Sequence, residues 1–351
     1  MLKITVVDTI FPLGHKKLNH ILIRLFPEEI KDILVVNFNN FYNKDQLPNV
    51  RLADVNLFGV YKKYTINILL QIVNYLLIFF KLFNRNNDIR IYFTFDNIAF
   101  LFANFLFFNR RNIIIHHNNT DLLQNKYHRI FFKLYMNKVE HIVFASFIKD
   151  KLIDLGVRDN KIFVIPHPIS KENLKNLSMH KSESIFIGIG YASDESLFSE
   201  IIAYEEKFKI LNTNNIKLVL RSKSLNYTNR NIQIITGHLT EENYESLNSN
   251  ASGILCLYPK SYKYRYSGAI LDGIKHKKFI IGSNIPIVNH FINIYPSLCY
   301  AFDSVEELFN LMVKLRNQNY DLDEYNSFTR YHGNENVCIA IRNMIYDDNK
   351  K

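Results

Sequence analysis

Cysteine is scarce in this chain, and its placement excludes two classes of small stabilised protein. The 351 residues include three cysteines, Cys256, Cys299 and Cys338, and no two of them form a Cys-x-x-Cys pair. A disulfide framework or a structural zinc site would need more thiols at closer spacing. The scarcity favours a reducing compartment, and we expect a cytoplasmic protein.

The sequence also lacks the modules of nucleic-acid-binding proteins, although it is basic. It has no zinc-finger spacing, no RNP-like aromatic motif and no arginine-rich arm, so we expect no nucleic-acid partner. The net charge of +10 is uneven, because residues 1–170 hold 22 Lys and Arg against 13 Asp and Glu. The remainder holds 21 against 20. The first half is therefore expected to face something anionic.

Two strongly apolar runs in that half, 66–83 and 99–108, make a membrane surface the favoured anionic partner. A transmembrane helix needs about 20 largely apolar residues, and the first run is about that long. It is interrupted, roughly along one helical face, by Asn67, Gln71, Asn74 and Lys81. Three interpretations stay open: a core helix, a spanning helix, and an interfacial helix whose basic ends meet anionic lipid.

Strand-like and helix-like stretches alternate along the whole chain, which predicts an α/β fold. The opening MLKITVV is interpreted as a first strand, because Asp8 interrupts its apolar run too early for a signal peptide. Uniform apolar runs of five or six residues are typical of strands buried on both faces of a parallel sheet. The expected strands are 3–9, 33–38, 89–95, 112–117, 141–146 and 161–168, then 184–190, 216–222, 231–237, 253–259, 278–283 and 298–302. The helices expected between or after them include stretches near 15–26, 64–83, 97–108, 121–138 and 195–210, one that starts at 268 and one at 304–316.

This pattern predicts two doubly wound Rossmann-like domains. We place the first at 1–169, a polar linker at 170–183 and the second at 184–332. The remaining 333–351 is expected to form a C-terminal helix that packs back on the first domain. Because ligands of open α/β sheets sit at the carboxyl ends of the strands, we expect a ligand in a cleft between the two domains.

The stretch YRYSGAILDGIKHK at 264–277 is the strongest candidate for an anion site. Ser267 is expected to cap a helix that starts at Gly268, where the free amides and the positive end of the helix dipole favour an anion. Arg265 would add a bidentate phosphate ligand. Asp272, one turn further on, would read ribose hydroxyls. The alternative is that Arg265 and Asp272 form a surface ion pair beside an ordinary capped helix.

Two segments resemble glycosyltransferases of the GT-B fold. The run NIQIITGHLTEENYESLNSNASGILCLYPKSYKYRYSGAILDGIKHKKFIIGSNIPIV (231–288) resembles the second-domain core of the GT4-like group. HIVFASFIKDKLIDLGVRDNKIFVIPHPI (141–169) is similar to the segment that leads into that family's interdomain linker. The resemblance implies two Rossmann-like domains facing across a cleft and the transfer of a sugar from a nucleotide-activated donor, as in enzymes of bacterial surface-polysaccharide assembly.

The resemblance also implies roles for residues of the second half. In the family's E-x7-E frame, Asp272 takes the place of the second glutamate and Tyr264 that of the first, which contacts the donor sugar. Ser267, Gly268 and Arg265 would hold the diphosphate, with Tyr266 between them in the donor-binding set. The basic residues that the family carries after the first strand of this domain are missing. Arg221 and Lys223 either replace them or lie in a solvated loop.

In the first half the resemblance points to two loops. Gly14 and His15 match the family's glycine-containing loop after the first strand, although Gly14 is equally interpreted as a turn glycine. His116 and His117 end a strand where the family places a histidine near the donor sugar. Neighbouring strand residues point to opposite faces, so one of the two can serve, and His117, followed by Asn118, is preferred. Such a pair cannot chelate one metal ion, and we expect no metal or other cofactor.

The predicted function is therefore sugar transfer from a nucleotide-sugar donor to a glycan acceptor, with Arg265 and His117 as catalytic residues. The family resemblance implies retention at the anomeric carbon. The basic, apolar first half suggests a polyprenyl- or otherwise lipid-linked acceptor and a peripheral position at the inner face of the plasma membrane. Three alternatives stay open: an inverting transferase with His117 or His15 as base, a nucleotide-sugar epimerase, and a catalytically silent nucleotide- or glycan-binding subunit.

Overall fold

The computed structural model describes residues 2–61, 63–82, 88–106, 110–117, 119–169, 184–190, 192–237 and 239–346. The chain divides into two compact units, and each is described by itself. Unit 1 comprises residues 1–168, 264–266 and 332–351, and unit 2 comprises residues 169–263 and 267–331. The expected linker at 170–183 lies outside the described residues.

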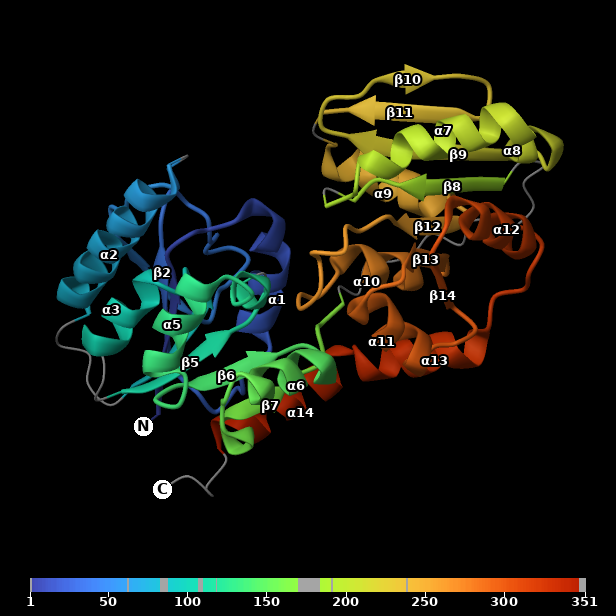
Figure 1. Cartoon of the computed structure of the whole chain (residues 1–351). Coiled ribbons are helices and arrows are strands. Elements are labelled where there is room, and N and C mark those ends of the chain that lie inside the picture. The colour runs from blue at the N-terminus through green and yellow to red at the C-terminus, as the bar shows by residue number, and fades with distance from the viewer. Residues whose placement is uncertain are drawn as a thin grey trace. The chain divides into compact units, whose positions relative to one another are not determined.

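Unit 1 is built on a parallel sheet in the strand order β3-β2-β1-β4-β5-β6-β7 (Figure 1). Its strands are β1 (Lys3–Asp8), β2 (Asp32–Asn37), β3 (Arg51–Asp54), β4 (Asp88–Thr94), β5 (Arg111–Ile115), β6 (Glu140–Val143) and β7 (Ile162–Val164). Every pair of neighbours is parallel, for example β1 with β4, where Ile4 faces Ile89. Successive strands are added on one side of β1 up to β3 and on its other side from β4 onward, as expected of a doubly wound sheet.

Helices cover both faces of this sheet. They are η1 (Leu13–His15), α1 (Lys16–Arg24), α2 (Tyr64–Lys81), α3 (Ala99–Leu106), α4 (Asn119–Leu122), α5 (Lys126–Tyr135), α6 (Ser146–Asp154), η2 (Asp159–Lys161) and α14 (Asn334–Ile345). One core joins Ile4 and Val6 of β1 to α1 and α14. The other joins Val7 of β1 to α2, α3, α5 and α6. Alternate side chains of β1 thus pack into opposite cores, which follows from the two-residue period of a strand.

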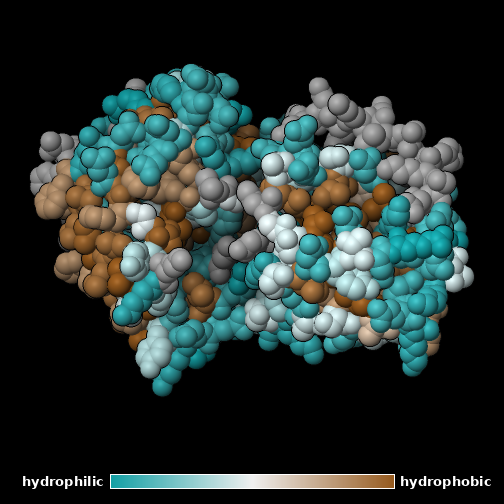
Figure 2. All heavy atoms as spheres, turned by 90° about the horizontal axis from the view of Figure 1, so that it is seen from above, coloured by the Kyte–Doolittle hydropathy of each residue, from teal (hydrophilic) through white to brown (hydrophobic). Residues whose placement is uncertain are grey.

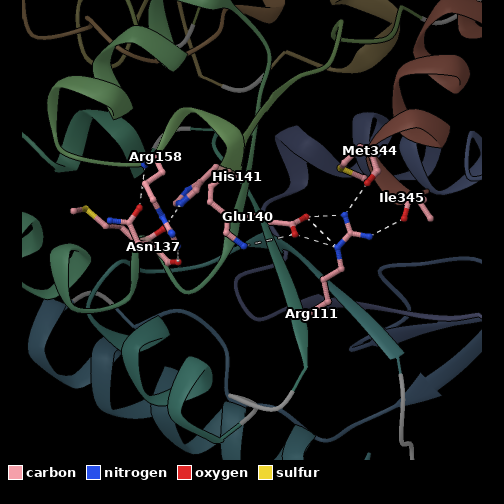
Figure 3. A network of polar contacts seen from close by, with 9 residues as sticks. Arg111, Asn137, Glu140, His141, Arg158, Met344 and Ile345 are labelled. Carbon is pink, nitrogen blue, oxygen red and sulfur yellow. Dashed lines mark hydrogen bonds and ion pairs between the residues drawn. The ribbon is translucent and has the colours of Figure 1, made fainter. Parts of the chain in front are cut away.

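Arg111 at the start of β5 fastens α14 to unit 1. Its guanidinium pairs with Glu140 at 2.8 Å and donates to the carbonyls of Met344 and Ile345, both at 2.7 Å (Figure 3). The last carbonyls of a helix have no intrahelical donor, so a cation at that end satisfies them and complements the helix dipole. The carboxylate of Glu140 is almost fully buried, so the pair compensates a charge that would be costly alone.

Unit 2 repeats the architecture with the order β10-β11-β9-β8-β12-β13-β14. Its strands are β8 (Ser184–Gly188), β9 (Ile216–Ser222), β10 (Tyr227–Thr228), β11 (Ile232–Thr236), β12 (Gly253–Cys256), β13 (Phe279–Ser283) and β14 (Cys299–Phe302). Only the short edge strand β10 runs antiparallel to its neighbour. The helices are α7 (Ser196–Phe208), α8 (Ile210–Thr213), α9 (Glu241–Asn250), α10 (Gly268–Lys275), α11 (Pro286–Ile294), α12 (Val305–Leu315) and α13 (Leu322–Tyr331).

Close packing fixes α10 against this sheet. Leu255 and Ile281 enter the core that α7 and α12 cover, whereas Ile254 and Ile280 point to the other face and meet α10. A side chain at Gly273 would come within 2.4 Å of Ile280 and 2.8 Å of Ile254. Glycine therefore lets α10 lie directly on β12 and β13. The N-cap of α10, Ser267, lies 2.5 Å from the hydroxyl of Tyr258, which follows the carboxyl end of β12.

The predicted doubly wound architecture is confirmed in both units, with local differences. The strands β3 and β10 were not expected from the sequence. The helix expected over 121–138 is interrupted, because Asn125 caps a second helix by accepting a hydrogen bond from the Tyr127 amide at 2.8 Å. The helices α11 and α13 were also not expected.

Candidate functional site

The two histidines at the end of β5 have different environments. His116 Nε2 lies 2.9 Å from His141 Nδ1, and its Nδ1 lies within 3.3 Å of the Asn119 amide and the Thr120 hydroxyl. His141 Nε2 lies 2.7 Å from the carbonyl of Met136, so that nitrogen must donate. It follows that His116 donates from Nε2 to His141 and accepts at Nδ1.

Both of these imidazoles are neutral in this arrangement. Burial holds the pKa of His141 at about 4 and lowers the pKa of His116 well below its usual value, with the neighbouring His141 adding to the effect on His116. Because both ring nitrogens of His116 are bonded within unit 1, the prediction that it contacts the donor gains no support from its position.

His117 is the histidine of the pair that retains an unbonded nitrogen. It is buried, and within the described residues its Nε2 has no hydrogen-bond partner. Its ring lies 4.5 Å from the ring of His15, whose Nδ1 also lacks a partner in the described part of the chain. Burial lowers the pKa of both histidines, and the proximity of His15 depresses that of His117 further. The neutral imidazoles of His117 and His15 can therefore each form a hydrogen bond with a ligand, as donor or as acceptor.

Aromatic side chains surround this histidine pair. Phe144, just after β6, lies 5.5 Å from the His117 ring and 4.9 Å from the ring of His167. Tyr266 stacks on His167 at 5.3 Å with an interplanar angle of 13°. Burial holds the pKa of His167 at about 3, so it too is neutral. Residues that follow β5, β6 and β7 and the segment 264–266 thus form one cluster in unit 1.

The loop that carries Gly14 and His15 is held by a buried carboxylate. Asp8, the last residue of β1, accepts hydrogen bonds from the amides of Ile10 at 3.0 Å and Phe11 at 2.8 Å, and from the hydroxyl of Thr94. Burial raises the pKa of Asp8 while these donors lower it. Gly14 has open space around it, since a side chain there would meet nothing within 4 Å. Backbone at this position is therefore accessible to a ligand.

Asp121 bonds both the side chain of Arg265 and the backbone amide of Tyr264. The amide of Tyr264 donates to Asp121 Oδ1 at 2.6 Å, and Arg265 Nε ion-pairs with Asp121 Oδ2. The carboxylate is 4% exposed and the guanidinium side chain 28% exposed. A buried acid thus orients a partly exposed cation. The structure pairs Arg265 with Asp121, whereas the surface-pair alternative paired it with Asp272.

The N-terminus of α10 has the predicted cap. Ser267 Oγ accepts from the amide of Ile270 at 3.3 Å and lies 2.5 Å from the hydroxyl of Tyr258. Gly268 is exposed, and a side chain there would meet nothing within 4 Å. The first amides of a helix have no carbonyl partner inside it, so this open tip can bind an anion.

Asp272 lies one turn beyond this tip and faces α9. It accepts a hydrogen bond from the hydroxyl of Tyr244 at 3.1 Å. Burial raises the pKa of Asp272, partly offset by that hydrogen bond. A carboxylate that is held by a tyrosine in this way is fixed in orientation, as a reader of hydroxyl groups needs to be.

Arg221 and Lys223 stand at the carboxyl end of β9. Arg221 Nε donates to the carbonyl of Gly237 at 2.9 Å. The carboxylate of Glu195 fixes the backbone after β9 by accepting hydrogen bonds from the Lys223 amide and the Ser222 hydroxyl, both at 2.7 Å. The side chain of Lys223 is exposed. Both cations therefore sit at the edge of the sheet where a ligand of unit 2 is expected.

Sequence reasoning missed several residues of these clusters. Asp121, Phe144, His167, Tyr244 and Glu195 all hold or surround the predicted residues. Their partners lie between 27 and 144 positions away in sequence, the longest separation being that between Asp121 and Arg265, and no local pattern marks such pairs. Asn118, which the prediction for His117 invoked, lies outside the described residues.

Comparison with known proteins shows what this architecture resembles. No protein-family model matches the chain, and no curated protein matches it. Among solved structures, the lipopolysaccharide outer core galactosyltransferase WaaB matches with a TM-score of 0.67 at 13% identity, over 99% of both chains. HepE from Anabaena, solved in complex with UDP-glucose, matches with a TM-score of 0.66 at 10% identity, over 99% of this chain and 100% of that one.

The chain has the GT-B fold. The same GT-B architecture accounts for a further match, the UDP-GlcNAc 2-epimerase from Methanocaldococcus jannaschii, with a TM-score of 0.62 at 15% identity over 99% and 100% of the two chains. In terms of this GT-B fold, the histidine cluster belongs to the N-terminal Rossmann-like unit and the capped tip of α10 to the C-terminal one.

Proposed function

We propose that this GT-B protein is a glycosyltransferase that moves a sugar from a nucleotide-sugar donor to a glycan acceptor. The observation that carries the proposal is the tip of α10, where a serine cap, an exposed glycine and a guanidinium two residues earlier combine in one short segment. The fold adds support, since structures that share it include a galactosyltransferase and a protein crystallised with UDP-glucose.

The residues have distinct roles in this proposal. The Gly268 and Ala269 amides and Arg265 would neutralise the departing diphosphate, which is the charge that develops during transfer. Asp272, oriented by Tyr244, would accept hydrogen bonds from ribose hydroxyls. His117 and His15, neutral at pH 7, would contact the donor sugar or the acceptor hydroxyl. Transfer would then rest on positioning and charge stabilisation by this chain's own groups.

Binding and turnover of nucleotides test the proposal directly. Thermal unfolding is followed with UDP, GDP and CDP, and nucleotide sugars are then screened for transfer and hydrolysis. We expect one nucleoside diphosphate to raise the unfolding temperature and its sugar derivatives to be turned over. If none of the three changes the unfolding temperature, the chain is a scaffold or binding subunit and the enzyme proposal fails.

Finer features of the reaction are part of the proposal. We infer that the acceptor is a lipid-linked glycan in surface-polysaccharide assembly. The support is the exposed apolar surface of unit 1 and the shared fold with a lipopolysaccharide galactosyltransferase. Retention at the anomeric carbon rests on the resemblance of 231–288 alone. Anomeric proton couplings of the product tell retention from inversion.

An epimerase is the second candidate, because UDP-GlcNAc 2-epimerases share the fold over the whole chain. It would need no acceptor. Incubating the donor alone distinguishes the two: an epimerised sugar still attached to its nucleotide would favour the epimerase, whereas a donor that stays unchanged until a glycan is added would favour the transferase.

A further inference from the structure

Helix α2 buries two amide side chains and exposes a stripe of apolar ones. Gln71 and Asn74 are 1% and 0% exposed. Gln71 Nε2 donates to the carbonyl of Thr9 at 3.0 Å. The side chain of Asn74 accepts from the backbone amide of Phe58 at 2.8 Å and donates to its carbonyl at 2.9 Å. The opposite stripe, at helical spacing, consists of Leu69, Val73, Leu76 and Phe80. A surface helix in water has the reverse arrangement.

Helix α3 shows the same reversal. Asn104 is buried, while Phe102 and Phe105 are 45% and 75% exposed. The two phenylalanines are three residues apart and therefore share one face of the helix. α3 packs beside α2, so the outward side chains of the two helices belong to one layer.

Helix α5 packs beside α3 and continues the layer with a mixed outer face. Tyr127, Ile130 and Leu134 are exposed, and Phe132 and Tyr135 point into the core. The exposed basic residues Lys126, Arg129 and Lys133 alternate with the apolar ones. We call the outward side chains of α2, α3 and α5 the docking face. Figure 2 shows a broad hydrophobic area on the part of unit 1 that is visible there.

We propose that the docking face binds the surface of an anionic lipid bilayer. None of the three helices contains an Asp or a Glu, and Lys63 and Lys81 flank the apolar stripe of α2. Aromatic and aliphatic side chains interleaved with Lys and Arg are the composition of a helix that lies in a membrane interface, where basic side chains reach lipid phosphates. A protein interface is instead depleted of lysine at its core.

The internal bonds of α2 also decide how the protein meets the bilayer. α2 is the one described helix that is long and apolar enough to cross a membrane by length and composition alone. Its buried side, however, is bonded through Gln71 and Asn74 to the loops that follow β1 and β3. It also contributes Tyr75 and Ile78 to the core of unit 1. α2 therefore lies along the interface with Phe80 and Leu69 among the lipids, and does not span the bilayer.

Site-specific tryptophan fluorescence tests this docking. The chain has no tryptophan, so a single substitution is an unambiguous reporter. Phe105→Trp on the docking face is compared with Phe208→Trp, an exposed phenylalanine on α7 of unit 2. With phosphatidylcholine vesicles containing 30% phosphatidylglycerol, we expect a blue shift and quenching by brominated lipid for Phe105→Trp only. The same shift at both positions, or at neither, overturns the proposal.

Sedimentation with the same vesicles tests separately the basic and the apolar side chains of the docking face. Bound protein should fall at least tenfold between 50 and 500 mM salt, because salt screens the basic residues. It should fall at least tenfold in the Phe80→Ser/Phe105→Ser variant and remain unchanged in Phe208→Ser. Loss of a dimer in Phe80→Ser/Phe105→Ser, without vesicle binding by the parent protein, would assign the face to a second copy and refute the proposal.

These measurements need neither donor nor acceptor, so their outcome is independent of the proposed sugar transfer. Each variant should fold, because all substituted side chains point to solvent. Far-ultraviolet circular dichroism checks this. A catalytically active protein that ignores vesicles would reject docking alone, and an inactive protein that binds them would reject transfer alone.

Discussion

Asp121 and Arg265, 144 positions apart in sequence, form an ion pair in which the acid is buried and the base is partly exposed. The same carboxylate accepts the amide of Tyr264, so it fixes the backbone as well as the guanidinium. The ion pair through Nε holds the guanidinium of Arg265 in a defined orientation. We interpret Asp121 as the residue that positions Arg265 for a phosphate group.

This relationship predicts a coupled loss of nucleotide affinity. Arg265→Ala should weaken binding of the preferred nucleoside diphosphate by about 30-fold, roughly 2 kcal/mol, and leave binding of the nucleoside nearly unchanged. Asp121→Asn should weaken it about tenfold, because Arg265 loses its orientation. In the Arg265→Ala background the second substitution should have little further effect. Calorimetric titration measures all four states of the cycle.

Arg330→Ala, at an exposed position on α13, is the matched control and should bind as the parent protein does. Tighter binding by Asp121→Asn would mean that the carboxylate competes with the diphosphate for Arg265 and would contradict the positioning role.

The two histidines at the end of β5 should respond to substitution in opposite ways. His117→Gln should lower the transfer rate by about a hundredfold, a range typical of losing a positioned proton-transfer group, with little change in unfolding temperature. His116→Gln should lower the unfolding temperature, because it disrupts the chain of hydrogen bonds through His141, and keep the activity of the folded protein. Rate and thermal unfolding are measured on the same preparations. Equal effects of both substitutions would argue against assigning the site to His117.

Acid should destabilise the protein through its buried neutral histidines. Burial holds the pKa of His141 at about 4 and that of His167 at about 3, below the usual 6.5. The unfolded chain therefore binds these protons more readily than the folded protein. The stability contributed by each neutral ring is fully present above pH 6.5 and is lost as the pH falls towards the folded value. At pH 5 we expect a loss of about 2 kcal/mol for each such histidine.

Unfolding by urea between pH 7 and pH 5 measures this slope. His141→Gln is the informative variant, since an amide can donate to the Met136 carbonyl and accept from His116 without titrating. Its slope should be shallower than that of the parent protein, and an unchanged slope would exclude His141 as a contributor.

Arg111 should be a principal stabilising residue of unit 1. Arg111→Met leaves the buried Glu140 carboxylate without its main partner and the last carbonyls of α14 without their donor. We expect a loss of roughly 3 kcal/mol, as for other broken buried pairs. Arg51→Met removes an exposed arginine that pairs with Asp32, and should cost at most about 1 kcal/mol. Thermal unfolding of the two variants compares them, and similar shifts would show that α14 is held mainly by its apolar contacts.

Much of the fold could be predicted because buried parallel strands leave a strong local pattern. The runs around Ile113–Ile115 and Ile280–Ile281 are uniformly apolar, and both form interior strands of their sheets. The strands β3 and β10 escaped prediction because they are short and carry few apolar residues. The capped tip at Ser267 and Gly268 was also predictable, since capping depends on neighbours within four positions.

The sequence by itself determined the doubly wound units, the cap of α10 and the excess of positive charge in the first half, because each follows from composition or from short-range spacing. The tertiary structure alone decided that Asp121 holds Arg265 and that His117 and not His116 keeps an open nitrogen within the described residues. It also decided that α2 buries Gln71 and Asn74 and exposes Leu69 and Leu76. These features depend on which side chains the fold brings together from distant parts of the chain, as with the 144 positions between Asp121 and Arg265, and on which face of a helix finds partners. No local pattern encodes either of them.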